Sequence, residues 1–209
     1  MPTGAIVLAI LGPLAVAAVW LFVRSGRVSL WVGNGILMPI VGGLSLATGL
    51  IETSDRFEAQ WAAILGLTAG AGLYAATVAF MALAGRWPPL ARHTSKLYES
   101  RSGVSLPVAL LVSAILVAPG EELLWRGVVL ETLHDGVASP AWLAPVLGWL
   151  AYVIANAASG SLPIVLGAVV GGAAWTVLAE LTDGVLASVA CHIVWTGLMV
   201  AFPPVPRPR

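Results

Sequence analysis

Two adjacent carboxylates and a guanidinium stand in the middle of apolar sequence. Glu121, Glu122 and Arg126 lie within Pro119-Gly120-Glu-Glu-Leu-Leu-Trp-Arg-Gly, and residues 104–118 and 127–130 carry no charge. A charge at the centre of a membrane helix is costly and is rarely present without a function. A carboxylate in such a place can act as a general base toward a water molecule. If the flanking sequence is membrane sequence, this stretch is the candidate functional site.

The three charges are not equivalent on a helix. Glu122 and Arg126 are at i, i+4 with the acid on the N-terminal side, which favours an ion pair. Successive residues are rotated by about 100°, so Glu121 points elsewhere and has no local partner. Glu121 is therefore our candidate for chemistry, and a purely structural charge network is the alternative. Pro119 and Gly120 predict a kink that would turn a helix N-terminus toward the carboxylates.

Three further polar residues lie in later apolar sequence: Asn156, His192 and Thr196. A histidine can exchange a proton near neutral pH, although a lone histidine on an apolar helix is more often a hydrogen-bonded core residue. His93 and His134 fall in expected loops, where we predict that they are solvated.

The composition indicates an integral membrane protein. The 209 residues are 59% hydrophobic and 10% charged, whereas a soluble domain is about 25% charged. The formal net charge of zero argues against a nucleic-acid partner. Cys191 is the single cysteine, so the chain has no intrachain disulfide.

Seven apolar segments predict an all-α, polytopic transmembrane helix bundle of about seven helices. The segments are residues 4–23, 28–51, 59–83, 104–133, 141–158, 163–179 and 184–202. We divide the chain into three N-terminal transmembrane helices (1–85), a basic cytoplasmic loop (86–103), and a core of four transmembrane helices with a short C-terminal tail (104–209). The first segment has no basic residue ahead of it and stays hydrophobic through Phe22, so we interpret it as a retained helix and not a signal peptide.

The charges between the segments predict the orientation. With seven helices, one side carries Arg24, Arg27, Arg86, Arg92, Lys96, Arg101, Arg207 and Arg209. The other side carries Glu52, Asp55, Glu58, Asp135, Glu180 and Asp183, with Arg56 as its one basic residue. Basic loops face the cytoplasm, so we expect the N-terminus outside and the C-terminus in the cytoplasm.

Two pairs of glycines put small residues on one face of a helix. These are Gly66 with Gly70 and Gly167 with Gly171. Such pairs allow close approach of two helix backbones. We interpret them as packing within one bundle and rank a dimer interface below that.

The order and spacing of the polar residues resemble a known family. Glu121-Glu122-x-x-x-Arg126, then Tyr152-x-x-x-Asn156, then His192-x-x-x-Thr196 is similar to the CPBP intramembrane proteases. That family includes the CAAX prenyl endopeptidases and the bacterial Abi-type proteins. The resemblance covers about residues 108–199.

The resemblance implies a glutamate-dependent peptidase acting on a peptide or lipidated peptide within reach of the bilayer. Its first motif glutamate matches Glu121 and activates water together with the histidine of an FxxxH motif. The histidine and asparagine of a final HxxxN motif, at His192 and Thr196 here, stabilise the oxyanion. The family is often called metalloprotease, but we favour a site without zinc; a divalent zinc would have Glu121 and His192 as its candidate ligands.

The chain departs from the family at two motif positions. Asn156 replaces the histidine of FxxxH, and Thr196 replaces the last residue of HxxxN. Asparagine cannot accept a proton at neutral pH and is a poor metal ligand beside imidazole. In an active enzyme, Glu121 would be the base, Asn156 would orient the water, and His192 with Thr196 would donate to the oxyanion.

Two other functions stay open from the sequence. The first is a catalytically impaired pseudoprotease that binds peptides or membrane partners without cutting them. The second, which we rank below both protease-family readings, is a proton-coupled transporter using Glu121 and His192. Convergence of Glu121, Asn156, His192 and Thr196 on one water-accessible cavity would support the first two readings.

Overall fold

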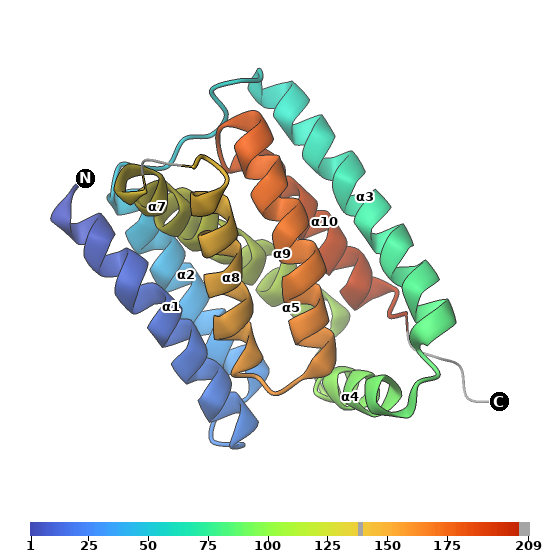
Figure 1. Ribbon diagram of the computed structural model, residues 1–209. Coiled ribbons are helices and arrows are strands. Elements are labelled where there is room, and N and C mark those ends of the chain that lie inside the picture. The colour runs from blue at the N-terminus through green and yellow to red at the C-terminus, as the bar shows by residue number, and fades with distance from the viewer. Residues whose placement is uncertain (138–139, 205–209) are drawn as a thin grey trace.

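Long apolar helices run back and forth between two ends of the molecule. The computed structural model describes residues 1–137 and 140–204, and within these ranges it holds helices and no strand (Figure 1). The apolar helices are α1 (Thr3–Arg24), α2 (Leu30–Ala47), α3 (Ala59–Ala84), a continuous helical rod (Leu106–Gly136), α8 (Leu143–Ala157), α9 (Leu162–Thr182) and α10 (Leu186–Ala201). Each coincides with one of the seven apolar segments, which confirms the predicted helix bundle.

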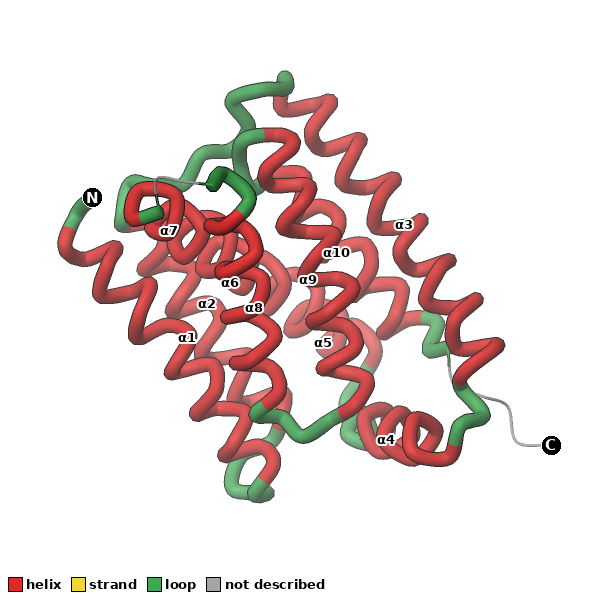
Figure 2. The backbone as a smooth tube through the Cα atoms, viewed as in Figure 1, coloured by secondary structure: helices red, strands yellow, loops and turns green. Residues whose placement is uncertain are grey.

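The apolar helices differ in length. Over the described residues, five of them are long and apolar enough to cross a membrane, whereas α8 and α10 have 15 and 16 residues. Because a helix rises about 1.5 Å per residue, these two span only about 22 and about 24 Å. Loops join the helices at the two ends of the bundle (Figure 2).

The central rod combines α-helical and π-helical segments. In chain order these are α5 (Leu106–Leu110), η1 (Leu111–Val117), α6 (Ala118–Glu122), η2 (Leu123–Val129) and α7 (Leu130–Gly136). The α6 segment, which carries both glutamates, therefore lies between two π-helical segments. Such wide turns occur frequently at functional sites.

The stretch predicted to be a basic loop, residues 86–103, contains a helix. This helix, α4 (Pro88–Glu99), begins with two prolines in its first turn, where a missing N–H costs no hydrogen bond. It is amphipathic: Leu90 and Thr94 are buried, and the basic side chains of Arg92 and Lys96 are exposed. It lies across the end of the bundle near α9 (Figure 1). The predicted loop is wrong for residues 88–99, because the polar face of this helix dominates the composition of the stretch.

Close backbone contacts position the helices around the rod. A Cβ atom on Gly70 would lie 2.6 Å from the carbonyl oxygen of Cys191 on α10, and Gly66 meets Ala187 in the same way. These two glycines therefore pack α3 onto α10 inside the bundle, as predicted. Gly120 packs equally closely on α2, where its Cβ would lie 2.8 Å from the carbonyl carbon of Met38.

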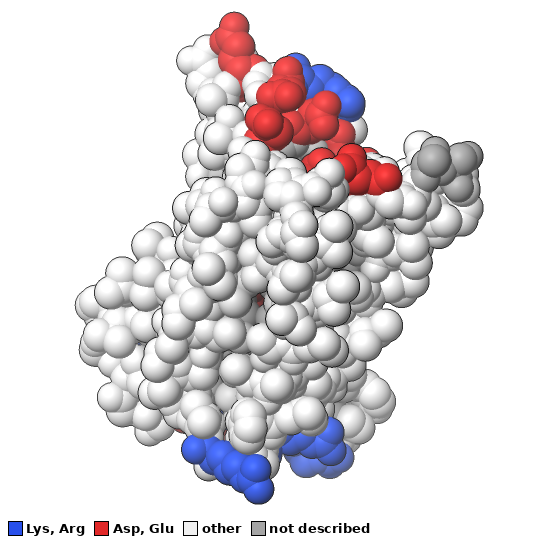
Figure 3. Space-filling view, turned by 90° about the vertical axis from the view of Figure 1, so that its left-hand side faces the viewer, with Lys and Arg blue, Asp and Glu red and all other residues white. Residues whose placement is uncertain are grey.

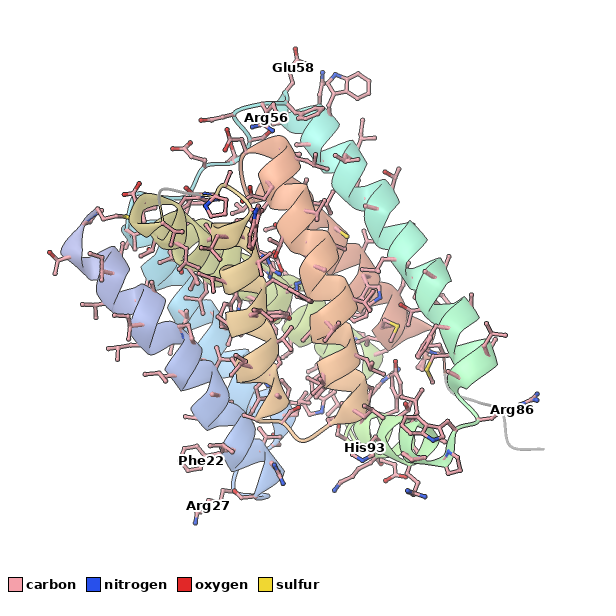
Figure 4. The ribbon with its side chains drawn as sticks, in the orientation of Figure 1. Phe22, Arg27, Arg56, Glu58, Arg86 and His93 are labelled. Atoms are coloured by element: carbon pink, nitrogen blue, oxygen red, sulfur yellow. The ribbon has the colours of Figure 1, made fainter. Side chains whose placement is uncertain are left out.

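Opposite charges gather at opposite ends of the bundle. Figure 3 shows acidic residues with a few basic atoms at one end and basic residues at the other. Arg56 and Glu58 lie at the acidic end, and Arg27 and Arg86 at the basic end (Figure 4). The charge asymmetry expected from the sequence is thus present, and the side that faces the cytoplasm stays a prediction. Arg207 and Arg209 lie outside the described residues.

Candidate active site

Glu121 lies at the middle of the rod. It is residue 16 of the 31 residues of Leu106–Gly136, so about 22 Å of helix precedes it. Its side chain is buried, with 6% of its surface exposed. The polar site is therefore far from both ends of the bundle.

The rod passes the site without a break. The backbone has right-handed helical dihedral angles on both sides of the acidic pair, at Val117, Ala118, Glu122 and Leu123. No helix N-terminus therefore points at the carboxylates, and the prediction made from Pro119 is wrong. Pro119 has no N–H to donate to the preceding turn. The π-helical segment ends at Val117, two residues before Pro119. The helix is therefore widened near the proline, and no new helix begins there.

Glu122 is the centre of a buried polar network. Its Oε1 accepts a hydrogen bond from Nη1 of Arg126 at 3.1 Å, which is the predicted i, i+4 ion pair. The same oxygen lies 2.8 Å from Nδ1 of His192. The side chain of Glu122 is fully buried. Glu122 therefore links the rod to α10.

Arg126 links the rod to two further helices. Its Nη2 donates to the carbonyl oxygen of Gly172 at 2.7 Å and to the hydroxyl of Thr176 at 3.2 Å, both on α9. Its guanidinium lies 4.9 Å from the ring centre of Tyr152 on α8. These contacts compensate the burial of the charge, which would otherwise be strongly destabilising.

The hydrogen bond to Glu122 decides how His192 can act. Because Oε1 of Glu122 already accepts from Arg126, we assign the proton of the contact to Nδ1 of His192. In a singly protonated ring, Nε2 then presents its lone pair. Nε2 lies 4.0 Å from Oε2 of Glu121. The imidazole is stacked on Trp175, with 3.6 Å between ring centres, which fixes its plane.

Tyr152 is a site residue that the sequence analysis did not select. Its hydroxyl donates to Oε2 of Glu121 at 2.8 Å. Glu121 was expected to lack a partner on its own helix, and its partner indeed comes from α8. The sequence feature that could have indicated this role is a tyrosine at the phenylalanine position of the FxxxH-like motif, four residues before Asn156.

Asn156 is held by contacts inside the protein. Its Oδ1 accepts from the indole nitrogen of Trp20 at 3.0 Å, and its Nδ2 donates to the carbonyl oxygen of Tyr152 at 3.0 Å. The side chain thereby ties α1 to α8. These bonds leave one amide hydrogen of Asn156 for other partners.

One cavity collects the candidate residues. It has a volume of about 550 Å³, and its polar lining includes Glu121, Asn156, His192 and Thr196, so these four side chains share one space. Tyr152 lines the same cavity. Most of the remaining lining is apolar and comes from α3, α4, α9 and α10.

The ion pair lies beside this cavity and not in its wall. Glu122 and Arg126 do not line it, and Arg126 instead borders a smaller cavity of about 250 Å³ at the acidic end. Glu122 and Arg126, which the sequence predicts as site residues, therefore do not face the cavity. They contact residues that line it, His192 and Tyr152.

The donor set does not fit a catalytic zinc ion. Such sites have three protein ligands and an open position. Glu121 and His192 supply two ligands, and Asn156 contributes an amide that is already engaged. Over the described part of the chain, no group of three or more His, Cys, Asp or Glu side chains is placed to hold a metal ion.

Comparison with known proteins finds one family model that matches this core. No curated protein and no solved structure matches the chain. Residues 103–198 match the family model described as type II CAAX prenyl endopeptidase Rce1-like. The match covers the rod and α8 to α10, up to Leu198, which is just under half of the chain, and it agrees with the resemblance drawn from the motifs. With its long apolar helices, the chain is an integral membrane protein, and its residues 103–198 are similar to the Rce1-like type II CAAX prenyl endopeptidases.

Proposed function

We propose that this protein is an intramembrane endopeptidase in which Glu121 activates a water molecule for attack on a peptide bond. The observation that carries the proposal is the position of the Glu121 carboxylate in a largely apolar cavity, with Oε2 4.0 Å from Nε2 of His192. Two acceptors at this separation can be bridged by one water molecule that donates about 2.8 Å hydrogen bonds to both.

The reaction needs one proton acceptor and one donor to the developing oxyanion. As the water oxygen bonds to the peptide carbonyl carbon, Glu121 takes one water proton and the carbonyl oxygen becomes negatively charged. The C–N bond then breaks, and the proton passes from Glu121 to the leaving nitrogen. The hydroxyl of Thr196, which lines the cavity, is the proposed donor to the oxyanion.

His192 has a different role in this proposal from the one expected from the sequence. The sequence predicts that His192 donates to the oxyanion. Its Nδ1 proton is directed at Glu122, so in a singly protonated ring Nε2 can accept a hydrogen bond but cannot donate one. We therefore assign His192 to orient the attacking water.

The cavity supports an apolar peptide or a lipidated peptide as the substrate. Its lining extends from Glu121, at the middle of the rod, to Ser100 and Arg101 at the basic end. A substrate entering from that end would keep its polar part near Arg101 and place its apolar part among helices α3, α9 and α10. The lipid bilayer is the second proposed partner.

A pseudoprotease is the second candidate. The observation that favours it is Asn156, which has no proton-accepting nitrogen and is bonded to Trp20 and to the backbone of Tyr152. A protein with this site could hold a peptide in the apolar cavity without cutting it.

Reconstitution in lipid vesicles distinguishes the two candidates. The purified protein is incubated with peptides that carry free or farnesylated C-terminal cysteines, and the products are identified by mass spectrometry. We expect cleavage by the wild type and none by Glu121→Gln. Cleavage by Asn156→His alone would identify the natural protein as a pseudoprotease, and cleavage unchanged in Glu121→Gln would remove the assigned base.

A further inference from the structure

The strongest feature that the motifs leave unexplained is the phenol beside Glu121. We propose that Tyr152 is a positioning residue for Glu121, and that its hydroxyl supplies the polar contact that a histidine at position 156 would otherwise provide. This inference rests on the proposed function, because it assigns a role within the same reaction.

The phenol is held rigidly against the carboxylate. The Tyr152 hydroxyl donates to Oε2 of Glu121 at 2.8 Å, and the side chain is buried, with 4% exposed. Its ring packs edge-to-face against Trp125 and Trp175, with ring centres 5.3 and 6.2 Å away. Arg126 covers the ring at 4.9 Å. A side chain fixed on several sides can fix its hydrogen-bond partner in turn.

The hydrogen bond sets which way the carboxylate faces. Oε2 of Glu121 is both the acceptor for Tyr152 and the oxygen nearest to Nε2 of His192. A glutamate side chain has three rotatable bonds, so an acid without this donor could turn Oε2 away from the imidazole. Tyr152 keeps its own proton throughout, and Glu121 remains the group that accepts the proton from water.

The tyrosine and the asparagine that stand in place of the phenylalanine and the histidine of FxxxH belong together. Residues 152 and 156 are one helical turn apart on the same face of α8. A phenylalanine at the first position could not reach Glu121 with a hydrogen bond, and a histidine at the second would supply a ring nitrogen to the cavity. In this chain the polar contact to Glu121 comes from Tyr152, while Asn156 donates to the carbonyl oxygen of Tyr152.

Restoring the family pattern tests this exchange. Tyr152→Phe should lower kcat about 10-fold to 100-fold with KM within about twofold of the wild type, because a hydrogen bond to a charged group is lost. The double variant Tyr152→Phe/Asn156→His should regain at least half of the lost kcat on a logarithmic scale. Tyr74→Phe is the matched control, since the Tyr74 hydroxyl bonds to the carbonyl oxygen of Phe202, and its kcat should not change.

Three kinetic results would overturn the proposal. They are a kcat for Tyr152→Phe within twofold of the wild type, an effect on KM alone, and a double variant no faster than Tyr152→Phe. A purely structural role would lower the amount of folded protein without this split between kcat and KM and without the rescue.

An infrared measurement tests the contact independently of activity. The carboxyl band of Glu121 is identified as the difference between the wild type and Glu121→Gln in lipid vesicles. We expect Tyr152→Phe to shift that band and Tyr74→Phe to leave it in place. An unshifted band overturns the role of Tyr152 even in an active enzyme. A shifted band in a protein that cleaves no peptide supports the contact and defeats the proposed function.

Discussion

His192 Nδ1 lies 2.8 Å from Oε1 of Glu122, while its Nε2 lies 4.0 Å from Oε2 of Glu121. One imidazole thus faces both neighbouring acids with different atoms. The imidazole contacts Glu122 directly, and Glu122 is also paired with Arg126. Glu121, which borders the large cavity, instead accepts a hydrogen bond from Tyr152. The adjacent carboxylates therefore differ in their surroundings, and substitutions at them should have different consequences.

The first prediction concerns the ion pair. Arg126→Leu should destabilise the protein by about 3–5 kcal/mol, because it leaves the fully buried Glu122 with a charge that has lost its cation. Thermal unfolding in detergent measures the loss. The control is Arg56→Leu, whose 3.8 Å contact with Asp183 is exposed to solvent and should contribute less than about 1 kcal/mol. Equal effects of the two variants would contradict this account of Glu122.

The second prediction concerns the glycine that precedes the acidic pair. Gly120→Ala should lower stability by about 1–3 kcal/mol and move Glu121, because the new methyl group would meet the backbone of Met38 on α2. The control is Gly43→Ala, where a Cβ has open space. The same unfolding assay serves for both, and a neutral Gly120→Ala would show that the α2 contact is looser than described.

The third prediction concerns the cavity. Ala76 lines it and Ala75 does not, although both residues are exposed on α3. Ala76→Trp should raise KM roughly tenfold or more, which corresponds to lost burial of about two CH₂ groups of the substrate. Ala75→Trp should leave KM unchanged. Substrate titrations in vesicles decide, and equal KM values would place substrate binding elsewhere.

The fourth prediction concerns the orientation in the membrane. Single cysteines are introduced at Arg27, at the basic end, and at Glu58, at the acidic end, in a Cys191→Ala background. A membrane-impermeant maleimide added to intact cells should label the Glu58→Cys variant. It should reach the Arg27→Cys variant only after the membrane is opened. The reverse pattern would place the acidic end in the cytoplasm.

Features that depend on local sequence could be predicted, and those that depend on how helices face one another could not. The apolar segments and the Glu122–Arg126 pair follow from composition and from spacing along one helix. The choice of His192 between the two acids depends on the rotation of α10 against the rod, which no local pattern encodes. Tyr152 reaches Glu121 across 31 positions of sequence, and the same limit applies to it.

The backbone irregularities of the rod were also beyond the sequence. Pro119 signalled a disturbed helix, but a proline is compatible with a kink, a break or a wide turn. The two π-helical segments around α6 lie where the rod packs against α2 and α10, and the sequence does not reveal that packing. Helix α4 was missed because its buried residues, Leu90 and Thr94, are few among charged neighbours.

The single-turnover rate of peptide cleavage by Glu121→Gln in lipid vesicles tests the central claim most directly. A general base contributes about 10²-fold to 10⁴-fold to a rate, so we predict a fall of at least about 100-fold. Glu58→Gln, an exposed acid at the end of the bundle, is the matched control and should cleave at the wild-type rate. A rate for Glu121→Gln within twofold of the wild type would contradict the account.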